Sequence, residues 1–323
     1  MVATAETTRR RIGLPIDIVN ARKGKITASI APAICGVDPY TDAATAFMLI
    51  TGRVERIGSE AMEWGNRMEP IVLEAMQDRF PEYPVQRTQV WSEYAGAGLL
   101  AGKLGATIDA EINATTYAEA KTSGLHSGFA DLSEWGDPGT AEVPARVSVQ
   151  VAVQFICNPS KRLCVVPTFL GGRGFALYEI PRPDELVEAV RERLERFAVD
   201  NLARDIMPEP TGAESFLEAV KLVPRVEGKT TPIDNDLMLE LVRAREALKL
   251  AERDADAAKA KVMAALGDAE IGEAPSGRVS WKRTKDVSFF DKERFATEQP
   301  ALLDKYTGFR PGHRVFLVKP TKE

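Results

Sequence analysis

The chain has 323 residues, of which 44% are hydrophobic and 28% charged, with a formal net charge of -5. This length supports one substantial hydrophobic core and a second, smaller module, and the composition is that of a soluble globular protein. No apolar run is long enough for a membrane span and the first residues lack a signal peptide, so we expect a cytoplasmic protein without membrane contacts. Three cysteines without a CxxC pair and only two histidines argue against a disulfide framework, an iron–sulfur cluster and a His-ligated zinc site.

Basic residues are concentrated before residue 30, where the chain holds six of them against two acidic residues. We predict that residues 1–24 form a basic arm and that Arg22 and Lys25 contact phosphate groups, since clustered cations attract them. For Arg9, Arg10 and Arg11 the alternative is a solvated, disordered tail. The negative net charge does not oppose this prediction, because a protein can confine positive charge to a channel lining while its outer surface stays acidic.

Two amphipathic helices are predicted on either side of the central segment. The first covers residues 63–76, where apolar residues recur at helical spacing and Glu69 stands near the start. The second covers residues 147–156. Gln150 and Gln154 are four residues apart in it and therefore share one face.

Between these helices the sequence predicts two strands joined by a short polar turn. Residues 105–109 form a strand that ends in Asp109, and residues 117–122 form a second strand that carries Glu119 and Lys121. Side chains two apart on a strand point the same way, and pairing of the strands as a hairpin brings Asp109 beside Glu119. Two carboxylates then face one amine. Hard oxygen ligands of this kind suit Mg²⁺ or Mn²⁺, with Lys121 holding or deprotonating a water molecule.

An exposed, salt-bridged hairpin would carry the same residue types, so other segments have to agree. They do, because the sequence resembles the lambda-exonuclease-like, YqaJ-type viral recombinase nucleases of the PD-(D/E)xK superfamily. Five blocks carry the resemblance in the family's order: residues 26–29 with 35–40, residues 64–70, residues 105–109, residues 119–122, and the helix with Gln150 and Gln154.

The resemblance implies a role for each matching residue. Asp109, Glu119 and the backbone carbonyl of Ala120 become ligands of Mg²⁺, for which Mn²⁺ can substitute. Lys121 becomes the water-orienting residue, and Glu69 sits at the edge of the metal site. Gln150 positions the water or the Lys121 amine. Ser29, in the amino-terminal helix, contacts a DNA phosphate. Two positions depart from the family, which usually has Pro-Asp-Gly at residues 108–110 and a glutamine at Ala152.

The implied fold is α/β, a restriction-endonuclease-like core with a mixed central sheet, flanking helices and the metal site at the open edge of the sheet. We predict a strand hairpin over residues 161–180 and a covering helix from residue 183 to about 206, which complete a nuclease domain over residues 25–210. Breaker residues after position 206 indicate a linker over residues 211–232.

A long helix and a small α+β module are predicted over residues 233–323. Apolar residues in this helix step by four and three and form a heptad seam: Leu237, Leu241, Ala244, Leu248, Ala251, Ala255, Ala258, Val262 and Ala265. The seam predicts pairing with a second chain or with a neighbouring helix. The alternative is one long amphipathic helix that lies on its own domain.

Taken together, these expectations describe a metal-dependent phage-type exonuclease. The family resemblance implies 5′-to-3′ digestion of linear double-stranded DNA from its ends, a ring-shaped homo-oligomer, a trimer, and a single-strand annealing protein as partner in the bacterial cytoplasm. One alternative is a structure-specific or restriction-like endonuclease that uses the same metal site. Another is a DNA-end-binding assembly protein whose nuclease site is vestigial.

Overall fold

The computed structural model describes residues 15–55, 58–124, 132–223, 226–308 and 316–318. The chain divides into two compact units, Met1–Pro224 and Arg225–Glu323. The arginines predicted in the amino-terminal arm at positions 9–11 lie outside the described residues. In the described part of that arm, Ile16–Ala21 form helix α1, which buries Ile18.

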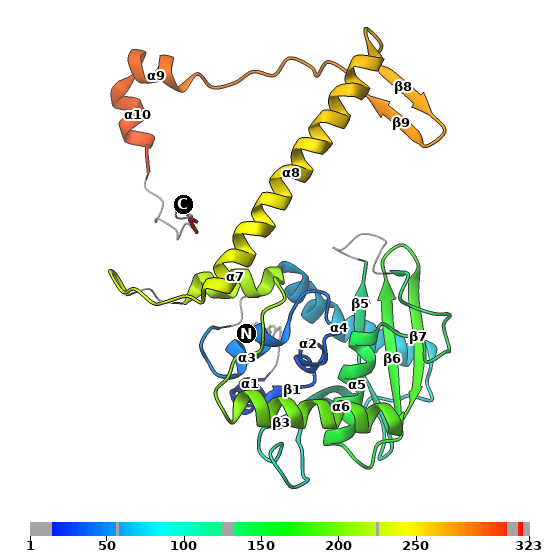
Figure 1. The fold of residues 1–323 in the computed structure, drawn as a ribbon. Helices are drawn as coiled ribbons and strands as arrows, with labels where there is room; N and C mark the ends of the chain where they lie inside the picture. The colour runs from blue at the N-terminus through cyan, green and yellow to red at the C-terminus, as the bar shows by residue number, and fades with distance from the viewer. Residues whose placement is uncertain (1–14, 56–57, 125–131, 224–225, 309–315, 319–323) are drawn as a thin grey trace, which may run out of the picture. The chain divides into compact units, whose positions relative to one another are not determined.

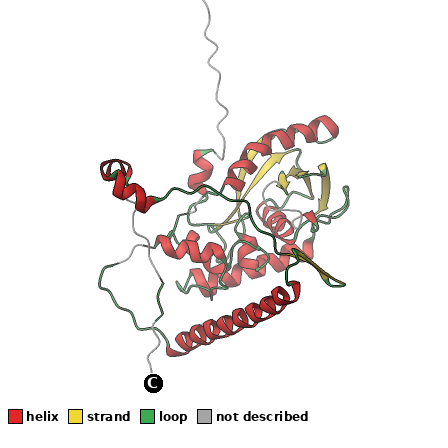
Figure 2. Cartoon of the chain, turned by 90° about the horizontal axis from the view of Figure 1, so that it is seen from above, coloured by secondary structure: helices red, strands yellow, loops and turns green. Residues whose placement is uncertain are grey.

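The first unit is built on a seven-stranded mixed sheet (Figures 1 and 2), which confirms the predicted α/β class. Strand β3 pairs in parallel with β1 and antiparallel with β2 and β4, while β6 pairs in parallel with β4 and β5 and antiparallel with β7. The strands are β1 Ile26–Thr27, β2 Arg87–Glu93, β3 Leu104–Glu111, β4 Thr116–Ala118, β5 Lys121–Ser123, β6 Leu163–Leu170 and β7 Gly174–Pro181.

Strands β4 and β5 are two parts of one interrupted strand. Thr116 of β4 lies opposite Leu163, and Lys121 of β5 lies opposite Thr168, so both parts keep the same register along β6. The interruption falls at Glu119 and Ala120, within the second strand of the predicted hairpin. The predicted strand is therefore present, and the pairing of β3 with β4 confirms the hairpin.

Helices cover both faces of the sheet. Helix α5 packs on β3 and carries α6 and α2 on its outer side, while α4 packs on β5, β6 and β7. Consecutive residues of β6 explain why both faces need cover, since Val165 belongs to the core under α4 and Val166 to the core under α5. The helices of this unit after α1 are α2 Ala31–Cys35, α3 Ala43–Ile50, α4 Glu60–Arg79, α5 Ala145–Cys157, α6 Asp184–Phe197, the short π-helix Ala198–Leu202 and α7 Glu214–Leu222.

Several helices and strands begin or end at residues other than those predicted from the sequence. Helix α4 begins at Glu60 because the Ser59 side chain caps it by accepting the N–H of Met62 at 3.2 Å, so Glu69 stands in mid-helix and not near the start. Strand β3 continues two residues beyond Asp109. The helix expected to reach residue 206 ends at Leu202.

The segment predicted as a linker, residues 211–232, contains helix α7. Its Ala219 is buried in a small core with Met48 and Val54, so an apolar face hidden behind breaker residues folds the segment back onto α3. The Asp42 carboxylate ties down the start of the segment by accepting hydrogen bonds from the backbone and side chain of Thr211, at 3.0 and 3.1 Å. The first unit therefore extends past residue 210.

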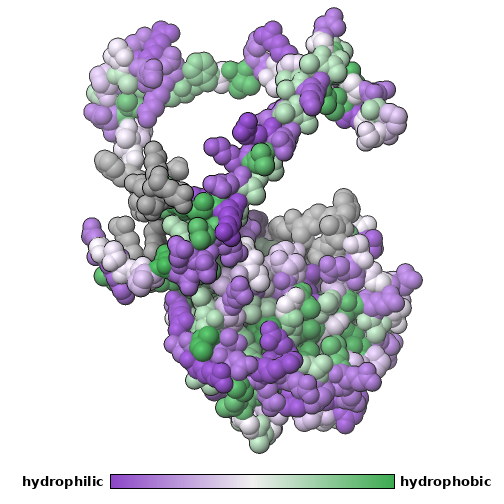
Figure 3. All heavy atoms as spheres, viewed as in Figure 1, coloured by the Kyte–Doolittle hydropathy of each residue, from purple (hydrophilic) through white to green (hydrophobic). Residues whose placement is uncertain are grey.

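The second unit contains a 32-residue helix, α8 Asn235–Leu266, in which no residue is buried. Figure 3 shows hydrophobic side chains between hydrophilic ones along it. After it come a hairpin and two short helices: β8 Ile271–Ala274, β9 Gly277–Ser280, α9 Lys292–Glu298 and α10 Pro300–Tyr306. None of the described helices is long and apolar enough to span a membrane.

We expect a chain that ends at Glu227 to remain folded, because the hydrophobic clusters of the first unit draw on residues no later than Val223. The truncated chain should show a cooperative thermal transition like that of the first unit within the full chain. It should no longer self-associate through the heptad seam. Thermal melting and the mass in solution by analytical ultracentrifugation check both points. An insoluble truncation would contradict the division into two units.

Paired substitutions in the full chain test the seam itself. Leu241→Glu with Leu248→Glu places charge in the seam and should lower the mass of the assembly. The control is Leu239→Glu with Leu250→Glu, two leucines of the same helix that are 40% and 58% exposed and lie off the seam. Equal effects of the two pairs would mean that the heptad pattern has no role in association.

Candidate active site

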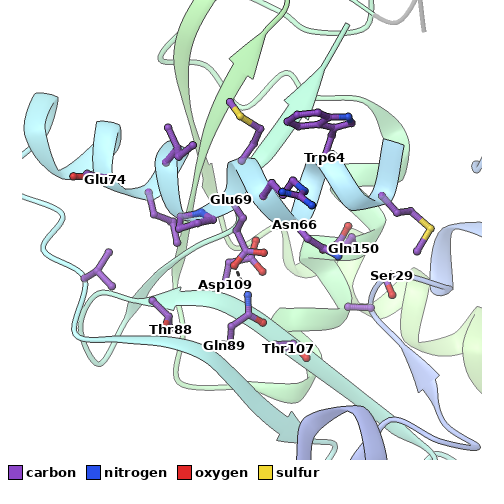
Figure 4. Close-up of a pocket in the computed structure, with 18 of the residues that line it drawn as sticks. Ser29, Trp64, Asn66, Glu69, Glu74, Thr88, Gln89, Thr107, Asp109 and Gln150 are labelled. Atoms are coloured by element: carbon purple, nitrogen blue, oxygen red, sulfur yellow. Dashed lines mark hydrogen bonds between the residues drawn. The ribbon is translucent and has the colours of Figure 1, made fainter. Parts of the chain in front are cut away.

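A cleft of about 1140 Å³ opens between α4, β2, β3 and the turn that precedes α2. Three of the predicted catalytic and metal residues line it, namely Glu69 from α4, Asp109 from β3 and Gln150 from α5 (Figure 4). Pro70 lies directly after Glu69 in α4 and cannot donate the helical hydrogen bond to the carbonyl of Asn66, another residue of this cleft. Residues of α4, β2, β3, α5 and the turn before α2 therefore line the same cleft.

Asp109 is joined to the Glu-x-Lys strand by a backbone contact. Its Oδ2 accepts a hydrogen bond from the N–H of Ala120 at 2.9 Å, one residue beyond Glu119 at the interruption between β4 and β5. The N–H of Glu119 still bonds to β6, at the carbonyl of Val165, at 3.0 Å. Interruption of the strand thus frees one N–H to hold the carboxylate of the neighbouring strand.

Glu119 is 2% exposed, and both of its carboxylate oxygens accept hydrogen bonds. Oε1 accepts hydrogen bonds from Lys121 and Gln150, and Oε2 accepts one from Gln154 at 2.5 Å. Gln154 also donates to the carbonyl of Thr107 at 2.9 Å, which links α5 to β3. The predicted grouping of Glu119, Lys121 and Gln150 is therefore found in the structure.

The acidic groups of the site outnumber its single ammonium. Burial raises the pKa of Asp109 well above its usual range, and the charges of Glu119 and Glu69 add to the shift. Burial also raises the pKa of Glu69. For Lys121, burial favours the neutral amine, but the carboxylates of Glu119 and Asp109 outweigh burial and raise its pKa. Lys121 is therefore charged at neutral pH.

This charge balance fits a divalent cation, since the charges of three carboxylates act on one another and on a single ammonium. Among the described residues no three Cys, His, Asp or Glu side chains converge to hold a metal ion. The predicted ligand set needs only two carboxylates, Asp109 and Glu119, with the carbonyl of Ala120. Such a set is typical of Mg²⁺, which keeps several of its waters.

The residues predicted to contact DNA do not all lie together. Arg22 and Ser29 line the cleft, and the Arg22 guanidinium donates to the Ser29 hydroxyl at 2.9 Å. Ser29 stands in the turn before α2 and not within a helix. Lys25 is outside the cleft because Glu93 and the carbonyl of Gly102 bind its ammonium, each at 3.0 Å. Its predicted role at the site is not supported by this position.

Sequence reasoning missed two residues of the site. Gln154 was visible as the partner of Gln150 on one helix face, but nothing showed that its amide would reach Glu119. Gln89 of β2 donates a hydrogen bond to Glu69 and lines the cleft (Figure 4). No pattern in the sequence marks it, because its place depends on how β2 pairs with β3.

Asp109→Asn should stabilise the metal-free protein at pH 8, because it removes a carboxylate that its neighbours repel. The pKa of Asp109 is higher in the folded state than its unfolded value of about 3.9. The folded state therefore binds more protons than the unfolded state. The free energy of unfolding falls as the pH rises from the unfolded pKa of Asp109 to its folded pKa. We expect a Tm increase of roughly 2–4 °C at pH 8 that shrinks towards pH 5.

Mn²⁺ should raise the Tm of the wild-type protein and have less effect on the Asp109→Asn variant, because a ligand that binds the folded state stabilises it. Differential scanning calorimetry with and without Mn²⁺ makes the comparison. Asp78→Asn, an exposed carboxylate of α4 outside the cleft, serves as the control. A lower Tm for Asp109→Asn at pH 8 would show that the bond from Ala120 outweighs the repulsion.

Comparison with known proteins supports the family predicted from the sequence. Residues 17–160 match the family described as YqaJ-like viral recombinase domain. A search of curated proteins gave no significant match.

Three solved structures are similar to part of this chain. The alkaline exonuclease LHK-Exo from Laribacter hongkongensis is 17% identical, with a TM-score of 0.46, and the match covers 59% of this chain and 94% of that chain. LHK-Exo in complex with dAMP is 18% identical, with a TM-score of 0.48 and the same coverage. A phage related exonuclease from Haemophilus somnus 129PT is 14% identical, with a TM-score of 0.41, covering 56% of this chain and 96% of that chain. The stretch that matches the YqaJ-like viral recombinase family, residues 17–160, includes Glu69, Asp109, Glu119, Lys121 and Gln150.

Proposed function

We propose that this protein is a metal-dependent DNA exonuclease of the phage type. It digests linear double-stranded DNA from an end, in the 5′-to-3′ direction, and leaves single-stranded DNA for recombination. Mg²⁺ is its cofactor and Mn²⁺ can substitute. The proposal includes a ring-shaped trimer and a single-strand annealing protein as partner, both from the family resemblance, and action in the cytoplasm of a bacterial host.

One observation carries the proposal: the contact between Ala120 and Asp109 places the Asp109 carboxylate at the Glu119–Lys121 strand. This contact joins Asp109, which lines the cleft, to the strand segment that carries Glu119, Ala120 and Lys121 behind it. Glu69 and Gln150 line the same cleft. A structural hairpin salt bridge would need neither the cleft nor the excess of carboxylates over cations.

The residues divide the chemistry among them. Asp109, Glu119 and the carbonyl of Ala120 would hold the cation, which lowers the pKa of water and offsets charge on the phosphoryl oxygens. Gln150 and Gln154 fix the rotamer of Glu119 without neutralising its charge. In the metal-free site the pKa of Lys121 is raised, and we assign this ammonium the role of orienting water and stabilising negative charge.

Substitutions at the site should separate binding from cleavage. Asp109→Ala and Glu119→Ala should each abolish cleavage and leave binding to DNA ends largely intact, since the carboxylates serve the reacting phosphate. Lys121→Ala should slow cleavage about 10²–10⁴-fold. Asp78→Ala is the control. Single-turnover digestion of a labelled duplex and filter binding measure the two steps, and near wild-type turnover in either carboxylate variant would contradict the assignment.

Linear and covalently closed plasmids with Mg²⁺ test the reaction itself. An exonuclease degrades the linear form and spares the closed circle. A restriction-like endonuclease with the same site would cut both forms, and an end-binding protein with a vestigial site would cut neither.

Ca²⁺ should inhibit digestion, because its larger and looser oxygen shell misplaces the reacting groups. Digestion that persists in excess chelator would exclude the metal mechanism.

A further inference from the structure

Gln89 has a backbone conformation that is unusual for its place in a strand. Thr88 pairs with Ala110 and Val90 pairs with Ile108, so Gln89 stands opposite Asp109 on the neighbouring strand. Its φ angle is 54°, in the left-handed region that residues with a side chain rarely adopt. Strain of this kind persists only where the surrounding structure enforces it, and it gathers at functional sites.

The side chain of Gln89 is directed to the same site. Its Nε2 donates a hydrogen bond to Oε1 of Glu69, and it has to be the NH₂ end that does so because a carboxylate can only accept. Its own Oε1 is buried and finds no hydrogen-bond partner in the described part of the chain. Figure 4 shows Gln89 directed towards Glu69 and Asp109 within the cleft.

We propose that Gln89 is a positioning residue, which holds the Glu69 carboxylate beside Asp109 so that both can serve a divalent cation. The inference rests on the proposed function and extends it to a residue of another strand. It explains the strain, because an extended residue at this position would place its side chain differently along β2. It also explains the buried Oε1, which can accept a hydrogen bond from a hydrated cation.

A positioning residue is needed here for an electrostatic reason. Glu69 feels the negative charge of Glu119, and its flexible side chain would otherwise turn towards solvent in the cleft. An amide donor holds the carboxylate without neutralising it, whereas a lysine or arginine at this place would cancel the charge that attracts the cation. Gln89 thus serves Glu69 as Gln150 and Gln154 serve Glu119.

Gln89→Gly separates the side chain from the backbone strain, because glycine adopts a positive φ readily. In the full chain we expect Mn²⁺ binding, measured by isothermal titration calorimetry, to weaken about 10–100-fold, the usual effect of losing a group that orients a metal ligand. The Tm of the metal-free variant should stay equal or rise. A purely structural Gln89 would give the opposite result, a lower Tm with unchanged Mn²⁺ affinity, and would overturn the proposal.

Two further variants sharpen the test. Gln86→Gly makes the same chemical change three residues earlier and outside the cleft, and should leave Mn²⁺ affinity unchanged. In a Glu69→Gln background, Gln89→Gly should weaken Mn²⁺ binding little further, because each substitution alone already removes the Glu69 carboxylate held by Gln89 from its position at the cation. Full additivity would show that Gln89 does not act through Glu69. A wild-type protein that binds no Mn²⁺ would instead overturn the proposed function itself.

Discussion

The geometry of the site depends on the hydrogen bond from the Ala120 N–H to the Asp109 carboxylate. In an unbroken strand this N–H would be directed into a ladder. The interruption at Glu119 and Ala120 keeps the register of β4 and β5 along β6, so the sheet loses little, while one donor becomes available to a side chain. Backbone and side chain thus fix each other, and the two carboxyl-bearing strands cannot shift independently.

Around this contact the protein concentrates negative charge and holds it with neutral donors. Glu119 receives two glutamine amides from α5, Glu69 receives one from β2, and Lys121 is the one ammonium that reaches Glu119 among the described contacts. Amides orient carboxylates without cancelling their charge. The site therefore keeps its shape and also keeps the negative charge that attracts a cation. The buried hydrophobic core on both faces of the sheet keeps these donors in place.

The sequence predicted the features that depend on local periodicity. The pair Glu119 and Lys121 follows from the alternation of a strand, and Gln150 with Gln154 from the repeat of a helix. Features that depend on distant pairing were not predictable. The binding of Lys25 by Glu93 and the approach of Gln89 to Glu69 both depend on how β2 pairs with β3. Helix α7 was missed because its short apolar face lies among breaker residues, and its stability comes from α3.

The conformation of strand β2 also bears on the solubility of the protein. It forms an edge of the sheet, since within the described residues it pairs with β3 alone. Exposed edges recruit strands of other molecules unless they are distorted or charged. The left-handed Gln89 interrupts the flat row of backbone groups, and Arg87 and Glu93 place opposite charges at its two ends. The distortion that reaches into the cleft therefore also protects this edge from aggregation, so a substitution that straightened β2 would affect the solubility of the protein as well as its chemistry.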